Sequence, residues 1–471
     1  MSETGASPAD ALVIFGITGD LARKMTLPAL YRLEAGGHLD CPIVGVARDD
    51  WSEAHLVTEI QAALQSEGEA VEDKVFDRLI RRLSYLPGDF ADPATFEALA
   101  CRLKDATRPL FYLEVPPELF GPVVASLGKA GLTANSQVMI EKPFGHDLGS
   151  ARKLNEDLHQ VLAEDQILRI DHFLGKQPVM DVAFLRFANA MFEPVWNRDH
   201  IASVQVSLIE DFGVEDRGGF YDAVGALRDV VQNHLLQTLA LITMESPIGS
   251  GSAGLWDRKV EVFRALADAD PARCVRGQYE GYCEVPGVKP DSVTETYVAL
   301  RLEVENRRWA GVPFFVRAGK AMAALATEVR VIFHRPPPLA FLEQPNHPDA
   351  NQLVFRIDPD AALRLVMASK GPEGRSTREV HLDLPFAAEL GQPPGPYERL
   401  LRDALVGDPS LFTREDAVEE TWRVLQPLVD HPPAPVTYPR GSWGPAAADE
   451  LVRGHPPWQQ PWLSEPQRVR R

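Results

Sequence analysis

Short apolar runs alternate with amphipathic stretches through the first third of the chain. Each run is short enough for a strand buried on both faces, and helix-length segments separate them. The runs cover residues 12–15, 43–46, 110–113, 138–140 and 167–170. This pattern predicts an α/β domain with a parallel sheet.

The pattern changes after Lys176. Apolar and polar residues then alternate with a period of two, which is typical of strands with one buried face. The alternating segments are 204–208, 298–304, 329–333 and 380–384. We therefore predict two domains, 1–176 and 177–471, the second being α+β with a mainly antiparallel sheet. The tail from His431 is rich in proline and tryptophan and is expected to wrap over the second domain.

Composition places the chain among ordinary globular proteins. It has 471 residues, 45% of them hydrophobic and 24% charged, which argues against collagen-like, disordered and disulfide-scaffold classes. The four cysteines show no CxxC spacing, as expected in a reducing compartment without a zinc cluster. No apolar stretch approaches the ~20 residues of a membrane span, and the first residues lack a signal-peptide pattern. We expect a soluble, cytoplasmic protein.

The net charge of −19 argues against nucleic acid as a partner, because that binding depends on Lys and Arg neutralising phosphates. The same field repels small anions at long range. Any phosphate pocket must therefore concentrate positive charge locally.

The first predicted strand leads into a glycine turn, Gly16-Ile17-Thr18-Gly19-Asp20-Leu21-Ala22. Glycines before a helix let backbone N–H groups approach a pyrophosphate. The GxxGxxA spacing also fits a tight turn without a ligand. The next strand ends at Arg48 and Asp49; arginine suits the 2′-phosphate of NADP and an acidic residue suits the free 2′-hydroxyl of NAD. The residues alone leave this choice open.

Two further segments follow predicted strands, at the sheet edge where open α/β folds bind ligands. Lys142 lies in Glu141-Lys142-Pro143, whose Lys-Pro bond could be cis; a surface lysine beside a turn is the alternative. His172 and Lys176 precede a predicted helix with Pro178 in its first turn. These two residues form the local positive cluster that a phosphate site requires.

A helix is predicted over 223–241. An α-helical wheel places four polar residues in one stripe: Asp222, Asp229, Asn233 and Gln237. His234 lies about 100° away, beside Leu227 and Val230. Such a histidine is more often a hydrogen-bonded core residue, but an apolar setting would also keep it neutral, as a general base must be.

Seven segments, in this order, together resemble glucose-6-phosphate dehydrogenase: GITGDLARK, EKPFG, RIDHFLGK, RFANAMFEPVWNRDHIA, GGFYDAVGALRDVVQNHLLQ, VPFFVRAGK and GSWGP. The resemblance spans nearly the whole chain. It implies an N-terminal Rossmann-type dinucleotide-binding domain followed by a larger α+β domain, whose sheet forms a homodimer that is sometimes paired into a homotetramer.

The resemblance also implies a reaction and a set of site residues. The reaction oxidises β-D-glucose 6-phosphate to 6-phospho-D-glucono-1,5-lactone, the first step of the oxidative pentose phosphate pathway, with hydride transfer to NADP and no metal. Because Asp49 stands beside Arg48, measurable activity with NAD is also expected. The implied catalytic residues are the base His234, its orienting carboxylate Asp171, and Lys142, between sugar and nicotinamide. Substrate contacts are Lys142, His172, Lys176, Glu210, Asp229 and Lys320. Cofactor contacts are Gly16, Thr18, Gly19, Asp20, Leu21, Arg48, Asp89, Phe90 and Lys142.

Three departures from the family pattern stand out. Phe173 replaces the tyrosine of the usual DHY, so a hydroxyl that normally helps hold the phosphate is missing. Asp49 follows Arg48 and is expected to weaken the preference for NADP. Residues 321–326 lack basic side chains, so no second NADP site is inferred.

Two other functions remain as alternatives. A related sugar oxidoreductase of the same plan would not need the cations at His172 and Lys176. A non-catalytic sensor of NADP and sugar phosphate would not need Asp171 and His234. The presence of all four residues favours the dehydrogenase.

Overall fold

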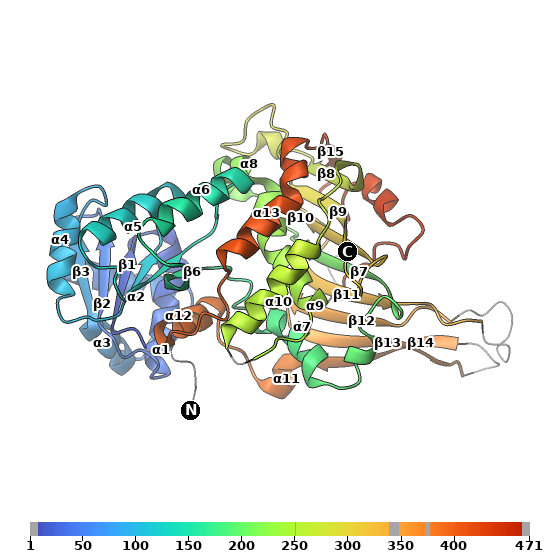
Figure 1. Ribbon diagram of the computed structural model, residues 1–471, viewed down its shortest axis with the longest axis horizontal. Helices are drawn as coiled ribbons and strands as arrows, with labels where there is room; N and C mark the ends of the chain where they lie inside the picture. The colour runs from blue at the N-terminus through green and yellow to red at the C-terminus, as the bar shows by residue number, and fades with distance from the viewer. Residues whose placement is uncertain (1–7, 250, 339–347, 373–376, 464–471) are drawn as a thin grey trace. The chain divides into compact units, whose positions relative to one another are not determined.

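The computed structural model describes residues 8–249, 251–338, 348–372 and 377–463. They form two compact units (Figure 1). The first unit comprises Met1–Lys176, Pro247–Asp257 and Pro394–Glu419, and the second comprises Gln177–Ser246, Arg258–Pro393 and Glu420–Arg471. The division falls inside two helices, α10 (Ser252–Ala265) and α13 (Glu415–Asp430).

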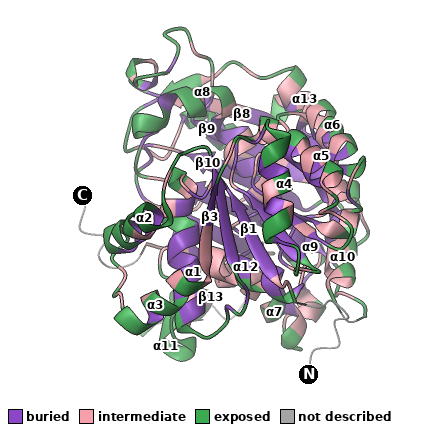
Figure 2. Ribbon diagram, turned by 90° about the vertical axis from the view of Figure 1, so that its left-hand side faces the viewer, coloured by how far each residue is buried: buried purple, intermediate pink, exposed green. Residues whose placement is uncertain are grey.

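The first unit is built on a six-stranded sheet in the order β3-β2-β1-β4-β5-β6, with every neighbouring pair parallel. This is the strand order of dinucleotide-binding folds. The strands are β1 (Ala11–Phe15), β2 (Ile43–Ala47), β3 (Leu83–Pro87), β4 (Pro109–Leu113), β5 (Gln137–Ile140) and β6 (Ile167–Arg169). The predicted parallel sheet and its five apolar strands are confirmed. The sequence did not indicate β3. This strand lies at the edge of the sheet and is partly exposed, whereas β1, in the middle of the sheet, is buried throughout (Figure 2).

Helices of the first unit pack in two groups beside this sheet. Helices α1, α2, α3 and α12 pack together, and α4, α5 and α6 form the other group. A π-helical turn, Ala22–Thr26, precedes α1. The helices are α1 (Leu27–Ala35), α2 (Glu53–Ser66), α3 (Asp73–Arg82), α4 (Pro93–Arg102), α5 (Phe120–Lys129), α6 (Leu148–His159) and α12 (Pro396–Val406), with short 3₁₀ turns at Pro117–Leu119 and Glu164–Gln166.

Side chains fix where several of these helices begin. Asp92 accepts a hydrogen bond from the amide of Ala94 (3.0 Å) just before Pro93 opens α4. Asp147 and Ser150 form a reciprocal capping box at the start of α6. Such caps satisfy amides that have no partner within the helix.

The second unit contains a nine-stranded sheet in the order β14-β13-β12-β11-β7-β10-β9-β8-β15. Its strands are β7 (Ile201–Ile209), β8 (Cys274–Tyr279), β9 (Tyr297–Glu303), β10 (Pro313–Gly319), β11 (Ala326–Phe333), β12 (Gln352–Asp358), β13 (Ala362–Lys370), β14 (Thr377–Pro385) and β15 (Val436–Tyr438). Most pairs are antiparallel, as predicted, but β7 with β10 and β8 with β15 are parallel. The sheet is therefore mixed.

Helical segments of this unit are α7 (Gln177–Ala188), α8 (Gly218–Ala226), a π-helical segment (Leu227–Leu235), α9 (Leu236–Thr243) and α11 (Phe386–Leu390), with 3₁₀ turns at Glu193–Val195, Glu215–Arg217, Pro271–Arg273, Tyr282–Glu284 and Ala446–Val452. The prediction of one regular helix over 223–241 is wrong. Gly225 breaks it with a φ of 70°, and a Cβ there would lie 2.5 Å from Oε1 of Glu295. That oxygen accepts the amide of Leu227 (2.9 Å) and so caps the segment after the break.

The tail lies against the sheet of the second unit. It adds β15, which the sequence did not indicate, and then crosses the sheet: Arg317 donates to the carbonyl of Gln459 (2.7 Å), and Arg364 lies 3.9 Å from the ring centroid of Trp462. Within the described residues, no helix combines the length and apolar character needed to cross a membrane.

Candidate active site

The glycine turn after β1 has the geometry that a dinucleotide requires. Gly16 has a φ of 86°, and a Cβ there would lie 2.2 Å from the carbonyl oxygen of Glu114. The amide of Gly19 donates to the carbonyl of Gly16 (2.8 Å) and closes the turn. Gly19 and Asp20 are exposed and Leu21 is half-buried, so the backbone at the start of the helical segment is accessible to a pyrophosphate.

Three predicted cofactor residues, Thr18, Arg48 and Asp89, and the neighbouring Asp49 form two pairs at the ends of β1, β2 and β3. Arg48 Nη2 lies 3.0 Å from Asp89 Oδ1, and both side chains are exposed. The Thr18 hydroxyl donates to Asp49 Oδ2 (2.7 Å). The amide of Ala91 and the Arg48 guanidinium lower the pKa of Asp89. The charges of Arg48 and Asp49 thus each have a local partner. Phe90, also predicted, is buried and packs edge-on against Phe15 in the core.

The segment 171–176 is a tight turn after β6. Asp171 is 2% exposed and accepts the amide of Phe173 at 3.0 Å. His172 and Lys176 are partly exposed, so two predicted phosphate ligands lie on one short turn. The ammonium of Lys176 lies 5.0 Å from the ring centroid of Phe173, which is therefore a cation–π partner of the lysine.

Two buried carboxyls lie beside this turn at the ends of β4 and β5. Glu141 accepts the hydroxyl of Tyr112 (2.7 Å) and a hydrogen bond from Tyr397, and Glu114 accepts the hydroxyl of Thr26. Burial raises the pKa of Glu114 to about 8 and that of Glu141 to about 7; the Glu141 carboxylate adds to the shift at Glu114, and the Asp171 carboxylate adds to the shift at Glu141. Lys142 opposes the shift at Glu141, and the Lys142–Pro143 bond is cis.

In the second unit, Glu210 and Lys320 meet because β7 and β10 are parallel and end in register, Ile209 opposite Gly319. Glu210 directly follows β7, and Lys320 directly follows β10. Lys320 Nζ donates to Glu210 Oε2 at 2.6 Å. The ammonium also lies 5.2 Å from the ring centroid of Phe212 and 5.4 Å from that of Tyr221.

Tyr221 connects this pair to Asp229. Burial raises the pKa of the Tyr221 hydroxyl, and the carboxylates of Asp229, Glu295 and Glu210 raise it further. Three predicted substrate residues therefore act on one buried tyrosine, Glu210 and Asp229 through their charges and Lys320 through its contact with the ring. The sequence did not indicate this tyrosine.

His234 lies on the same π-helical segment as Asp229 and is 4% exposed. A π-helix bonds residues five apart, so the α-helical wheel overstates the angle between positions 229 and 234. The predicted polar stripe of Asp222, Asp229, Asn233 and Gln237 is therefore wrong. Asp222 precedes the break at Gly225 and accepts hydrogen bonds from Tyr282 and Ser292, while Gln237 is buried.

Comparison with known proteins decides the family. Residues 13–181 match the family model described as the NAD binding domain of glucose-6-phosphate dehydrogenase, and residues 183–462 match its C-terminal domain. The chain belongs to the glucose-6-phosphate dehydrogenase family. It is 57% identical over 463 residues to glucose-6-phosphate 1-dehydrogenase 1 of Mycobacterium bovis, covering 98% of this chain and 99% of that protein.

Two solved glucose-6-phosphate dehydrogenases have the same fold. The crystal structure of the Mycobacterium avium enzyme superposes with a TM-score of 0.92 at 56% identity, over 97% of this chain and all of that one. A glucose-6-phosphate dehydrogenase in complex with its substrate superposes with a TM-score of 0.90 at 34% identity, over 98% of this chain and all of the other. The Rossmann-type domain followed by an α+β domain is thus confirmed, as is the family named from the seven segments.

The predicted site residues of this family member form two groups. The first unit holds the cofactor turn with Lys142, Asp171, His172 and Lys176, and the second holds Glu210, Asp229, His234 and Lys320. The roles of all these residues, and the pairing of Asp171 with His234, stay predictions. Glu114, Tyr112 and Tyr397 were missed. Tyr112 lies within the apolar strand β4 and Glu114 directly follows it, whereas Tyr397 is more than two hundred residues away in sequence.

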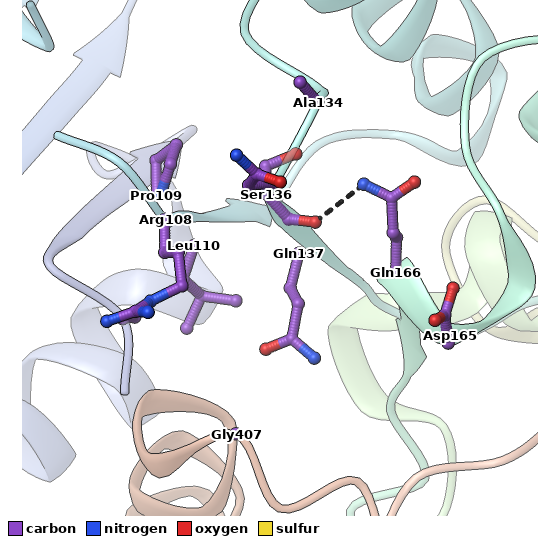
Figure 3. A pocket seen from close by; sticks show the side chains of 11 residues that line it. Arg108, Pro109, Leu110, Ala134, Ser136, Gln137, Asp165, Gln166 and Gly407 are labelled. Atoms are coloured by element: carbon purple, nitrogen blue, oxygen red, sulfur yellow. Dashed lines mark hydrogen bonds between the residues drawn. The ribbon is translucent and has the colours of Figure 1, made fainter. Parts of the chain in front are cut away.

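The first unit also has a cavity of about 540 Å³ at the opposite, amino-terminal edge of its sheet. Figure 3 shows Arg108, Gln137 and Asp165 around it, with Gly407 closing one side. None of the described residues that line this cavity is a predicted site residue.

Proposed function

We propose that this chain oxidises β-D-glucose 6-phosphate to 6-phospho-D-glucono-1,5-lactone. The observation that carries the proposal is the match over 98% of the chain to a protein named glucose-6-phosphate 1-dehydrogenase. Local geometry supports it: the first unit carries a tight glycine turn after β1 and a short turn that holds both His172 and Lys176, and the second carries the Glu210–Lys320 pair.

In this proposal, His234 takes the proton from O1 of the sugar while hydride leaves C1. Asp171 orients the imidazole and stabilises its protonated form. His172 and Lys176 hold the 6-phosphate, and Glu210, Asp229 and Lys320 contact the sugar or its phosphate. Lys142 lies between the sugar and the cofactor. When bound, the nicotinamide ring accepts the hydride.

NADP is the proposed cofactor, with measurable activity for NAD. Arg48 is exposed at the end of β2, where a forked contact with a 2′-phosphate is possible. Asp49 opposes that anion, but its carboxylate already accepts the Thr18 hydroxyl and is open to solvent, which screens its repulsion.

The test is reduced-nicotinamide absorbance with glucose 6-phosphate, glucose and galactose 6-phosphate, using NADP and NAD in turn. We expect the highest kcat/KM with glucose 6-phosphate and NADP. Faster turnover of free glucose would favour a different sugar oxidoreductase. Binding of glucose 6-phosphate without reduction of either cofactor would favour the non-catalytic sensor.

We further propose that the chain assembles through its nine-stranded sheet into a homodimer, or a homotetramer made of two dimers. Val380, Leu382 and Leu384 are 38%, 60% and 42% exposed on the edge strand β14. An exposed edge strand with apolar side chains favours pairing with another chain. Light scattering should give a mass at least twice that of the chain, and Leu382→Glu should lower it; a monomeric wild type would exclude the proposal.

Domain limits of 1–176 and 177–471 and a cytoplasmic location are also proposed. The boundary between the two family matches, at 181/183, supports a border close to Lys176, while the later segments Pro247–Asp257 and Pro394–Glu419 return to the first compact unit. All four cysteines are free, which suits a reducing compartment. Limited proteolysis and cell fractionation test these two proposals.

A further inference from the structure

Tyr397 lies against the turn that carries the predicted phosphate ligands. Its ring is stacked on the imidazole of His172, with centroids 6.3 Å apart and an interplanar angle of 11°. Both residues belong to the first unit, and Tyr397 is in the first turn of α12. A nearly parallel ring limits how far the imidazole can rotate about its side-chain torsions.

The start of α12 is itself held against this turn. Gly175 permits the approach, because a Cβ there would lie 2.7 Å from the carbonyl oxygen of Pro396. Arg399 Nη1 donates to the carbonyl of Gly175 at 3.2 Å. The same returning segment bridges β6, where the amide of Thr413 donates to the carbonyl of Arg169 at 3.0 Å. The ring of Tyr397 is therefore attached to a fixed backbone.

The hydroxyl of Tyr397 is held as well. It donates to the buried carboxyl of Glu141, which also accepts the hydroxyl of Tyr112 at 2.7 Å. Glu141 directly precedes Lys142. One tyrosine thus contacts a predicted phosphate ligand through its ring and the neighbour of the predicted nicotinamide-side lysine through its hydroxyl.

We propose that Tyr397 is a positioning residue, which holds the imidazole of His172 in the orientation that binds the 6-phosphate. The proposal rests on the proposed function, in which His172 contacts that phosphate. The proposal also explains how the chain can carry phenylalanine at position 173, where the family pattern has a tyrosine. The buried ring of Phe173 packs against Lys176, and the tyrosine that contacts His172 comes instead from α12.

The expected effect falls on binding of the phosphate group. An aromatic pair of this kind contributes an amount that corresponds to about 3- to 10-fold in affinity. Tyr397→Leu should therefore raise the KM for glucose 6-phosphate about 3- to 10-fold, with kcat within about 2-fold of wild type. Tyr397→Phe keeps the ring and should change KM less than about 3-fold.

The probe for direct binding is inorganic phosphate as a competitive inhibitor. Its inhibition constant should rise in Tyr397→Leu by the same factor as KM, whereas the KM for free glucose should stay unchanged. Tyr31→Leu is the matched control: Tyr31 is a buried tyrosine of the same unit whose hydroxyl bonds to the backbone of Ala70 and Glu72, away from this turn. It should leave all three constants unchanged.

His172→Ala separates this inference from the proposed function. Unchanged KM and phosphate inhibition in His172→Ala would refute the phosphate site itself. A rise in His172→Ala but none in Tyr397→Leu would refute the positioning role alone. In the His172→Ala background, Tyr397→Leu should raise KM by less than about 2-fold more. A further rise as large as that in the wild-type background would also refute the positioning role.

A second variant keeps the test valid if Tyr397→Leu does not fold. Tyr397→Met fills similar space without an aromatic plane and should raise KM and the phosphate inhibition constant like leucine. Tyr397→Trp restores a plane and should return both toward wild type. Equal constants for the methionine and tryptophan variants would overturn the proposal.

Discussion

Replacing Glu114 by glutamine should make the protein more stable at alkaline pH. Burial raises the pKa of this carboxyl from 4.5 to about 8, and the nearby Glu141 carboxylate adds to the shift. A carboxyl whose pKa is raised by folding binds its proton more tightly in the folded state. Its contribution to stability is therefore complete below pH 4.5 and is lost as the pH rises toward 8.

The size of this loss follows from the shift. At about 1.4 kcal/mol per pKa unit, keeping Glu114 protonated in the folded state costs roughly 4 kcal/mol at pH 8, and sharing the proton with Glu141 reduces this cost to about 2–3 kcal/mol. Glutamine has the same shape and cannot ionise, but its buried amide group needs a hydrogen-bond acceptor. The cost of burying this amide reduces the gain in stability by ~1 kcal/mol. We expect Glu114→Gln to gain about 1–2 kcal/mol at pH 8 and nothing at pH 5.5. For a unit of about 200 residues this is roughly 2–8 °C in Tm.

Thermal and urea unfolding at pH 5.5 and pH 8 measure this difference. Glu34→Gln is the control, because Glu34 is also buried in the first unit but is paired with Arg78 (2.7 Å) and Arg82 (2.8 Å). Removing its charge leaves two arginines without their carboxylate and should lower stability at both pH values. The reasoning is refuted if Glu114→Gln shows the same pH dependence as wild type, or if it is less stable than wild type at pH 8.

Three further predictions concern the reaction. His234→Asn should lower kcat at least ~10²–10⁴-fold with binding nearly unchanged; a variant that keeps more than half of kcat under rate-limiting hydride transfer excludes the base assignment. Lys176→Ala should raise the KM for glucose 6-phosphate by roughly two to four powers of ten and hardly affect free glucose, so equal losses on both sugars would exclude a phosphate contact. Arg48→Ala should lower kcat/KM for NADP roughly ten- to a hundredfold, and the effect should be nearer tenfold because Asp89 already pairs with the arginine. Asp49→Asn should sharpen the preference for NADP. If Arg48→Ala lowered kcat/KM equally for NADP and NAD, the contact between Arg48 and the 2′-phosphate would be refuted.

The parallel sheet of the first unit could be predicted because each central strand is a continuous apolar run. The edge strand β3 could not, since Leu83 and Ser84 are only half-buried and the run contains polar residues. Glu141 and Lys142 could be placed at the carboxyl edge from position alone. The partnership of Glu141 with Tyr397 could not, because a segment from late in the chain supplies the tyrosine.

The second unit was harder to predict because its backbone departs from regular geometry at the site. A wheel assumes 100° per residue, and both the break at Gly225 and the π-helical segment after it violate that assumption. The carboxylate of Glu295, which packs against Gly225 and caps the segment after the break, lies seventy residues away in sequence. Parallel pairing of β7 with β10 likewise depends on long-range topology, although it is what brings Glu210 to Lys320.

Two predicted anion contacts share a feature that affects how they work. Arg48 is paired with Asp89, and Lys320 with Glu210. A carboxylate partner reduces the net attraction for an incoming phosphate, but it also holds a long side chain in place, so less side-chain entropy is lost on binding. In a chain with a net charge of −19, long-range attraction for an anionic substrate is absent. Affinity must then come from short-range, oriented contacts, for which a cation held by its neighbours is better suited than a mobile one.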